Sequence, residues 1–346
     1  MATEAPAYQD PRLKASCGTR GFLNFQIHTL RALGTMTPGG FTYLADTVFG
    51  PIMKSGNKSA ARKWLVQENA EGCPVPSEWL SLKEVEGNGN SKSDVIIVWF
   101  PGGGFVTRSP SPVPFSLACL PRLQAALPKN TPLPKVLAVN YALPATADEA
   151  MTACEEAMAW ALQHGKKLIL GGDSAGGYLA VVMSRRAAAG ELSKVPTDAV
   201  IGTVGVCAWL DLTFSLPAFR ENAYNDMLSR RWIRSGAEAF VSKRVAAGAD
   251  KATALRELSP AVATGVDWSV LPKGSMMLIH GDRDRFRDDT FELAKKAPDG
   301  VKNVLVKDGV LGTHCGCLNS SSPTCDAIWE DVARFLAARI AWGHPC

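Results

Sequence analysis

The sequence predicts an α/β fold in which helices cover both faces of a mostly parallel central sheet. One pattern in the sequence leads to this prediction. Short apolar runs rich in valine, isoleucine and leucine, typical of buried strands, alternate along the chain with helical patterns. Such alternation makes the strands parallel and places helices on both sides of the sheet. Ligands of these sheets bind at the carboxyl ends of the strands, so residues that follow strands are the first candidates for a functional site.

The expected elements begin after a polar stretch at 1–20. Residues 21–65 carry two helical patterns, and alternating apolar residues at 79–85 predict a half-buried strand. Further strands are expected at 94–100, 135–141, 167–171, 199–208, 275–280 and 302–307. Helices are expected at 147–164, at 178–189 after the turn at 172–176, and at 328–340. The regions 18–70 and 214–265 do not fit the alternation of strands and helices.

The turn at 172–176 has the most informative sequence, Gly-Asp-Ser-Ala-Gly. It joins an apolar strand to a run of helix formers, and this context predicts that Ser174 is a nucleophile. The two glycines allow the strand and the helix to approach each other at a strained turn. The alternative is an ordinary glycine-rich turn that holds a phosphate, but no P-loop lysine and no Gly-x-Gly-x-x-Gly pattern supports it.

A serine nucleophile needs a general base, and the chain has only five histidines. Where the serine stands on such a turn, the acid and then the histidine follow it in the chain. His280 ends an apolar run and is expected to lie on a buried strand, and His344 is two residues from the end of the sequence. His314 lies in a glycine-punctuated loop after the strand at 302–307. His314 is therefore the candidate base, with a surface loop histidine as the alternative interpretation.

The acid is expected on the loop that follows the strand at 275–280. Four aspartates compete there: Asp282, Asp284, Asp288 and Asp289. Asp288 and Asp289 also fit the first turn of a following helix, where acids complement the helix dipole. The acid would hold the imidazole in one tautomer and stabilise the imidazolium that forms.

A second glycine-rich turn follows the strand at 94–100. Residues 101–105 read Pro-Gly-Gly-Gly-Phe, so backbone N–H groups are exposed without side chains in the way. Donors of this kind suit an oxyanion hole, which meets the charge that develops on a substrate carbonyl. Gly103, Gly104 and Ala175 are the expected donors. A flexible glycine loop is the alternative interpretation.

Four segments together resemble the hormone-sensitive-lipase branch of the α/β-hydrolases. They are 101–105, 172–177, 284–289 and 309–314, and they match a His-Gly-Gly-Gly block, a Gly-Asp-Ser-Ala-Gly-Gly turn, an acid stretch and a histidine loop. Bacterial family IV esterases, arylacetamide deacetylases and plant carboxylesterases belong to this branch. The resemblance implies an α/β-hydrolase fold with a helical cap and a triad of Ser174, Asp284 and His314. Asp284 is preferred because it aligns with the acid of the family stretch.

Three departures from the family pattern mark this chain as an outlier within the branch. Pro101 replaces the histidine of the first block, and a proline lacks an N–H and fixes φ. Arg285 replaces the proline after the acid, and a Cys-Gly-Cys run at 315–317 replaces the usual glycine and aromatic residue.

The resemblance also divides the chain into four parts. They are an N-terminal segment with the first part of the cap at 1–70, a core at 71–213, a cap insertion at 214–265 and the rest of the core at 266–346. Aromatic residues gather in the cap insertion, and such residues more often form core than pocket. Here they are expected to do both. The residues expected to line the substrate pocket are Phe105, Tyr178, Trp209 and Phe214.

The composition agrees with a globular enzyme. The chain has 346 residues, 46% of them hydrophobic and 20% charged, and a net charge of +4. No polybasic block favours nucleic acid, and no apolar run has membrane-spanning length. No signal peptide is recognisable, and nine cysteines without one indicate reduced thiols in a cytoplasmic protein. No metal or other cofactor is expected, because no second Cys-x-Cys or Cys-x-x-Cys pair accompanies Cys315 and Cys317. A homodimer is compatible with the sequence.

The expected function is that of a serine carboxylesterase acting on small to medium apolar acyl or aryl esters. An acyltransferase or a lactone-forming cyclase would use the same residues, because only the acceptor of the acyl group differs. A different class of function is a non-catalytic small-molecule receptor, since the gibberellin receptor resembles the same branch but lacks the histidine. His314 is present here and favours chemistry over binding alone.

Overall fold

The structure is a computed structural model that describes residues 63–83, 93–307, 309–318 and 323–343. Within these residues, eight strands form one sheet in the order β1-β2-β4-β3-β5-β6-β7-β8. Six of them run parallel, from β4 to β8, whereas β2 is antiparallel to both β1 and β4. The strands are β1 Leu65–Asn69, β2 Ser77–Leu82, β3 Val95–Phe100, β4 Val136–Val139, β5 Lys167–Asp173, β6 Val200–Val206, β7 Met276–Gly281 and β8 Val301–Val306. The α/β fold with a mostly parallel sheet is therefore confirmed.

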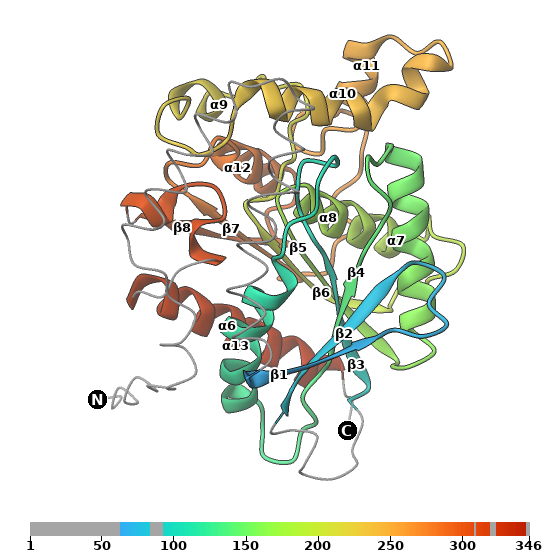
Figure 1. The fold of residues 1–346 in the computed structure, drawn as a ribbon, viewed down its shortest axis with the longest axis vertical. Coiled ribbons are helices and arrows are strands. Elements are labelled where there is room, and N and C mark those ends of the chain that lie inside the picture. Colours follow the sequence, from blue (N-terminus) through green and yellow to red (C-terminus); the bar gives the residue numbers. More distant parts are fainter. Residues whose placement is uncertain (1–62, 84–92, 308, 319–322, 344–346) are drawn as a thin grey trace.

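Helices lie on both faces of this sheet (Figure 1). The α-helices are α6 Pro112–Ala126, α7 Ala147–Ala161, α8 Ala175–Ala188, α9 Ala218–Glu221, α10 Arg230–Ala246, α11 Lys251–Glu257, α12 Arg287–Lys296 and α13 Pro323–Gly343. Two short 3₁₀ turns, η2 Gly309–Gly312 and η3 Gly316–Leu318, follow β8. α6 and α13 pack together on one face, and α7, α8 and α12 pack against strands on the other.

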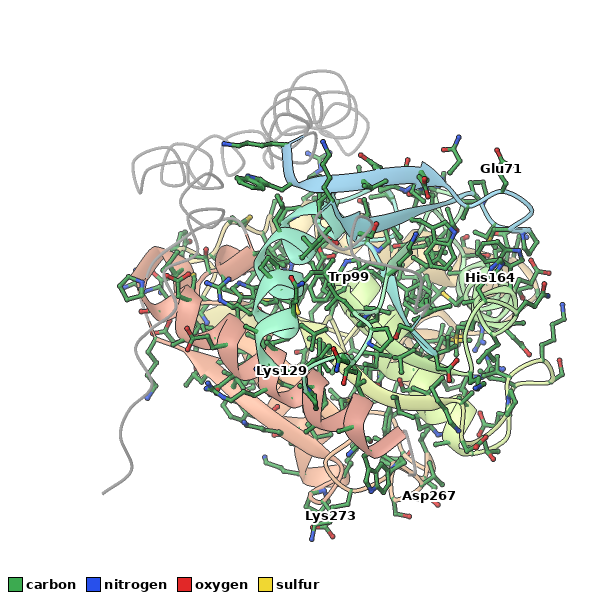
Figure 2. All side chains as sticks on the ribbon, turned by 90° about the horizontal axis from the view of Figure 1, so that it is seen from below. Glu71, Trp99, Lys129, His164, Asp267 and Lys273 are labelled. Carbon is green, nitrogen blue, oxygen red and sulfur yellow. The ribbon has the colours of Figure 1, made fainter. Side chains whose placement is uncertain are left out.

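The sequence of β3 shows why the sheet is buried on both sides. Its alternate residues divide between two hydrophobic clusters, one under each helical layer, and all six are buried. Trp99 faces the α6 side, where its ring stacks on Phe115 at a centroid distance of 3.9 Å. Figure 2 shows Trp99 inside the molecule, whereas Glu71, Asp267 and Lys273 lie at the periphery. Side chains on successive residues of a strand point to opposite faces, so a continuous apolar run is what a doubly covered strand requires.

Two elements differ from the expectation. The strand expected at 79–85 is β2, which begins at Ser77 and pairs with β1, an edge strand whose sequence is mostly polar and exposed. α6 is also unexpected, because it contains Pro112, Pro114 and Pro121. The first two prolines occupy the start of the helix, where a missing N–H costs little.

The cap insertion expected at 214–265 contains α9, α10 and α11. These helices stand together beyond one end of the sheet in Figure 1. α10 packs there directly on the glycine loop after β3, since a Cβ added to Gly236 would lie 2.2 Å from the carbonyl oxygen of Gly104. This end holds the carboxyl ends of the parallel strands. The first part of the expected cap, within 1–62, lies outside the described residues.

Candidate active site

Ser174 occupies the sharp turn between β5 and α8. Its backbone has φ 53° and ψ −120°, a conformation that costs a non-glycine residue about 1–3 kcal/mol. The neighbouring glycine makes the turn possible, because a Cβ on Gly176 would lie 1.9 Å from the carbonyl oxygen of Phe100. The fold holds the strained residue by hydrogen bonds from Ser174 N–H to Val206 O at 2.9 Å and from Trp209 N–H to Ser174 O at 3.1 Å.

The hydroxyl of Ser174 makes no hydrogen bond to any residue in the described parts of the chain. Ser174 is only 6% exposed, so its hydroxyl is largely shielded from solvent. Catalytic hydrogen bonds often form only when a substrate is bound. The turn that follows β6 connects this serine to the histidine loop: Trp209 binds Ser174 O, and Cys315 N–H donates to Sγ of Cys207 at 3.1 Å.

His314 and Asp284 form a buried pair. Nδ1 of His314 lies 3.1 Å from Oδ1 of Asp284, which also accepts the N–H of Phe286 at 3.0 Å. The ring of Phe286 meets the imidazole edge-on, with centroids 5.2 Å apart. Burial acts to lower the pKa of His314, but the nearby carboxylates, above all Asp284, outweigh it and the net pKa is raised. The pair is thus arranged to favour an imidazolium.

The other three aspartates that competed for the role of the acid have different partners. Asp282 uses its backbone N–H to bind Val306 O, and among the described residues its carboxylate makes no hydrogen bond to the imidazole. Asp288 pairs with Arg287 and accepts the N–H of Ala218 at 2.8 Å. Asp289 is buried and accepts the N–H groups of Leu210 and Asp211 at 2.8 and 2.7 Å. Asp288 and Asp289 do lie in the first turn of α12, as expected.

The glycine loop after β3 lies against Ser174, since a Cβ on Gly102 would come within 3.0 Å of Cβ of Ser174. Gly103 and Gly104 have φ of 118° and 62°, a region that other residues rarely adopt. No hydrogen bond among the described residues uses the N–H groups of Gly103, Gly104 or Ala175. The N–H groups of these three residues therefore remain available as hydrogen-bond donors, and their role as an oxyanion hole remains a prediction.

Pro101 is accommodated because its carbonyl, rather than the missing N–H, anchors the loop. The hydroxyl of Tyr141 donates to Pro101 O at 2.7 Å, and the N–H of Gly102 donates to Oδ1 of Asp173 at 2.9 Å. The same Oδ1 accepts the hydroxyl of Ser111. The aspartate of the serine turn thus connects that turn to the glycine loop.

A family model described as alpha/beta hydrolase fold matches residues 97–315, which is more than half of the chain. The chain belongs to this family. Among solved structures, EstE5 soaked with ethyl alcohol is similar at a TM-score of 0.67 and 20% identity, covering 96% of this chain and 99% of that one. An esterase from the bacterial hormone-sensitive lipase (HSL) family is similar at 0.66 and 20%, with coverage of 93% and 99%. An esterase/lipase from an uncultured bacterium reaches 0.63 and 22%, with coverage of 94% and 100%.

These structural similarities agree with the branch that the sequence motifs indicated, and at such identities they concern the fold. EstE5 was also soaked with p-nitrophenyl butyrate, and that structure is similar at a TM-score of 0.63. No curated protein matches the chain. None of the helices in the described residues of this hydrolase-fold protein is long and apolar enough to cross a bilayer. Its cytoplasmic location and its oligomeric state remain predictions.

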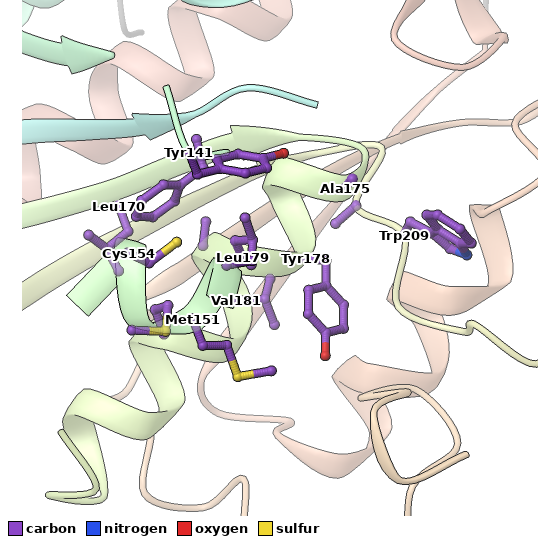
Figure 3. Close-up of a cluster of buried hydrophobic side chains, with 14 of the residues drawn as sticks. Tyr141, Met151, Cys154, Leu170, Ala175, Tyr178, Leu179, Val181 and Trp209 are labelled. Atoms are coloured by element: carbon purple, nitrogen blue, oxygen red, sulfur yellow. The ribbon is translucent and has the colours of Figure 1, made fainter. Parts of the chain in front are cut away.

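The four aromatic residues expected to line the substrate pocket belong to one cluster. Phe105 stacks on Phe240 at 3.8 Å and contacts the rings of Tyr178 and Trp209 at 5.7 Å, and Trp209 stacks on Phe214 at 5.8 Å. Figure 3 shows Tyr178 and Trp209 on either side of the start of α8, where Ala175 lies. Phe105, Tyr178 and Trp209 are at most 1% exposed, whereas Phe214 is partly exposed. Their packing is that of core residues, and their contact with a substrate remains a prediction.

A cavity of about 420 Å³ lies between α7, α8 and the region after α11, and Tyr178 forms part of its wall. Its lining includes Arg186, Arg244 and Trp268, and none of the residues around Ser174 except Tyr178. The lining contains both arginines and acidic residues, and Arg244 forms an ion pair with Asp148 at 3.0 Å. This cavity is distinct from the site at the carboxyl ends of the strands.

Two thiols flank the histidine. Cys207, Cys315 and His314 each offer a ligand atom within 4.8 Å of the others, so they are the residues that could hold a soft metal ion. Burial raises the pKa of Cys207 to about 11, and hydrogen bonding to Cys207 together with burial raises the pKa of Cys315 well above its usual value. A metal would have to displace these protons and would occupy the imidazole that the triad needs.

Sequence reasoning missed Asp226. This residue is fully buried, and one of its carboxylate oxygens accepts the backbone N–H of His314 at 2.9 Å. It lies in the segment assigned to the cap, and neither periodicity nor motif spacing distinguishes it from the other acids of that segment. Only the fold brings it to the histidine.

Proposed function

We propose that this protein is a serine carboxylesterase that hydrolyses small to medium apolar acyl or aryl esters. The observation that carries the proposal is the backbone of Ser174, which is strained at a strand-to-helix turn. Strain persists where the surrounding structure over-determines it, and it gathers at active sites. A turn of purely structural purpose has no need of a serine in this conformation.

In the proposed reaction Ser174 attacks the ester carbonyl while Nε2 of His314 takes its proton. Asp284 accepts the hydrogen bond from Nδ1–H, which fixes the tautomer and stabilises the imidazolium. The N–H groups of Gly103, Gly104 and Ala175 hold the negative charge that develops on the carbonyl oxygen. His314 then protonates the departing alcohol, and an acyl-enzyme remains. Water activated by the same histidine releases the acid and restores the serine.

The preference for apolar esters is supported by the aromatic cluster that surrounds the serine turn. Phe105 follows the glycine loop directly, and Trp209 binds the carbonyl of Ser174 through its backbone. The partly exposed Phe214 extends this cluster towards α9, where it contacts Phe219. An apolar acyl chain or aryl ring is the substrate group that the exposed face of Phe214 would stabilise by burial.

The proposal is tested with p-nitrophenyl butyrate and a fluorophosphonate that labels activated serines. We expect the full chain to hydrolyse the ester and to gain one phosphonate on Ser174, located by peptide mass spectrometry. The Ser174→Ala variant should do neither. Absence of both hydrolysis and labelling in the folded wild type would refute the proposal, and binding of an ester without turnover would favour the receptor alternative.

Labelled water separates hydrolysis from acyl transfer. A carboxylesterase places one ¹⁸O atom from the water in each butyrate that it releases. When a competing alcohol is added, a hydrolase continues to form mostly labelled acid. An acyltransferase or a lactone-forming cyclase would instead transfer the acyl group to an alcohol or to a hydroxyl of the substrate, and the acid would stay a minor product.

A further inference from the structure

Asp226 connects three separate segments around the histidine. It lies between α9 and α10 and is fully buried. Its Oδ1 accepts the N–H of Met227 at 2.7 Å and the N–H of His314 at 2.9 Å. Its Oδ2 accepts the N–H of Arg285 at 2.9 Å. Because a carboxylate has two acceptor oxygens, it can bind donors from the α9–α10 loop, the acid loop and the histidine loop together, which an amide cannot do.

The segment around Asp226 is bound to the acid loop by further hydrogen bonds. The side-chain amide of Asn222 donates to Asp284 O at 2.9 Å, and the guanidinium of Arg285 donates to Ala223 O at 2.7 Å. The same guanidinium lies 4.9 Å from the centre of the Phe219 ring. The segment between α9 and α10 is therefore fixed to the acid loop by several contacts.

Asp226 also carries charge next to the imidazole. Its carboxylate, that of Asp284 and a ring nitrogen of His314 lie within 4.8 Å of one another. Burial, and then repulsion by Asp284, raise the pKa of Asp226 to about 6, while His314 opposes the rise. Arg285, a charged residue on the acid loop, binds Asp226 through its backbone N–H.

We propose that Asp226 is a positioning residue for the histidine, which it holds through the backbone of His314 and supports with a second carboxylate. The inference rests on the proposed function, because it concerns the base of that reaction. The N–H bond from His314 sets the position of its Cα relative to Asp284, which binds the ring. Two anchors, one on the backbone and one on Nδ1, define where Nε2 points. Errors of about 1 Å in such an arrangement can cost about 100-fold in rate.

The test compares Asp226→Asn with a matched control, Asp211→Asn. Asp211 is also buried, and it accepts the N–H groups of Thr213, Ser215 and Leu216 at 2.8, 2.7 and 3.2 Å without touching the triad. Both variants lose acceptors of backbone hydrogen bonds, so both should lower the melting temperature. Only Asp226→Asn should lower kcat for p-nitrophenyl butyrate, by about 10- to 100-fold, with KM changed by less than about threefold.

The pH profile separates positioning from a purely structural role. The carboxylate of Asp226 contributes to the raised pKa of His314, so its removal should shift the acid limb of kcat/KM to lower pH. Asp211→Asn should leave the limb in place. Asp226→Glu keeps the charge but lengthens the side chain, and it should lower kcat without moving the limb. This second variant also serves where Asp226→Asn does not fold.

An NMR titration of the histidine Cε1–H signals measures the pKa of His314 without turnover. The signal of His314 is assigned as the one that is missing in His314→Asn. A wild type that labels with no phosphonate and hydrolyses no ester would refute the proposed function, while the titration would still test Asp226. If Asp226→Asn lowers only the melting temperature, and leaves kcat, the acid limb and the His314 titration as in Asp211→Asn, the positioning role is overturned.

Discussion

Replacement of Asp284 by asparagine is the sharpest test of the triad. Oδ1 of Asp284 accepts both the Nδ1–H of His314 and the N–H of Phe286. The amide oxygen of asparagine can retain these two hydrogen bonds. The variant then removes mainly the negative charge that stabilises the imidazolium in the transition state, with little change in side-chain volume.

The magnitude follows from the geometry of the pair. Nδ1 and Oδ1 are 3.1 Å apart. The charge centres of ring and carboxylate are then about 4 Å apart, which corresponds to about 4 kcal/mol at an effective dielectric constant of about 20. A loss of about 4 kcal/mol from the transition state slows the reaction by about 10³-fold. We therefore expect kcat/KM of Asp284→Asn to fall by about three orders of magnitude, with the acid limb moved to lower pH.

The assay is p-nitrophenyl butyrate hydrolysis across pH, with circular dichroism and thermal unfolding as controls for folding. Asp282→Asn and Asp288→Asn are matched variants on the same loop and should stay within about tenfold of the wild type. Asp289→Ala should lose stability instead, because it removes the oxygen that accepts the buried N–H groups of Leu210 and Asp211. The reasoning is refuted if Asp284→Asn retains a tenth of the activity, or if Asp282→Asn is the more damaging change.

Four further outcomes are expected. Ser174→Ala should lose about 10⁴-fold or more in kcat with unchanged melting temperature, and activity within tenfold of wild type would contradict its role. Gly176→Ala should destabilise the fold by about 3 kcal/mol or more, measured by chemical denaturation, because the added Cβ meets a backbone oxygen at 1.9 Å. The acid limb of kcat/KM should lie above pH 6.5, because a base with a raised pKa loses activity as the pH falls through that raised value; a limb below 6.5 would show that burial dominates at His314. Iodoacetamide at pH 7.5 should leave Cys207 and Cys315 unmodified in the folded protein, since both are buried thiols with raised pKa, and rapid alkylation by mass spectrometry would show an open site.

The parallel sheet was predictable because its signal is local. Strands such as β3 and β7 are continuous apolar runs, and a run buried on both faces needs no partner to be recognised. β1 was not predictable, because an edge strand with exposed polar residues resembles a loop in sequence. α6 was not predictable because it contains three prolines, and the free-energy cost of a proline in a helix depends on how far it lies from the first residue of the helix.

The candidate site also contains residues that the sequence predicted and contacts that only the fold could show. Ser174, Gly103, Gly104 and His314 stand in glycine-rich turns after strands, so the sequence by itself predicted their roles and their place at one edge of the sheet. The contact of Asp284 with the imidazole needed the fold, because the four aspartates of the loop are equivalent until their neighbours are known.

Asp226 was decided entirely by the tertiary structure. In the sequence it is 88 residues from His314, within a segment that has the composition of a helical cover. A charge can be buried only where donors converge on it, and the donors here come from three loops that meet only when the sheet has formed. Local patterns thus predict the candidate reactive groups of this protein, whereas the burial of Asp226 beside His314 depends on long-range packing, which no local pattern records.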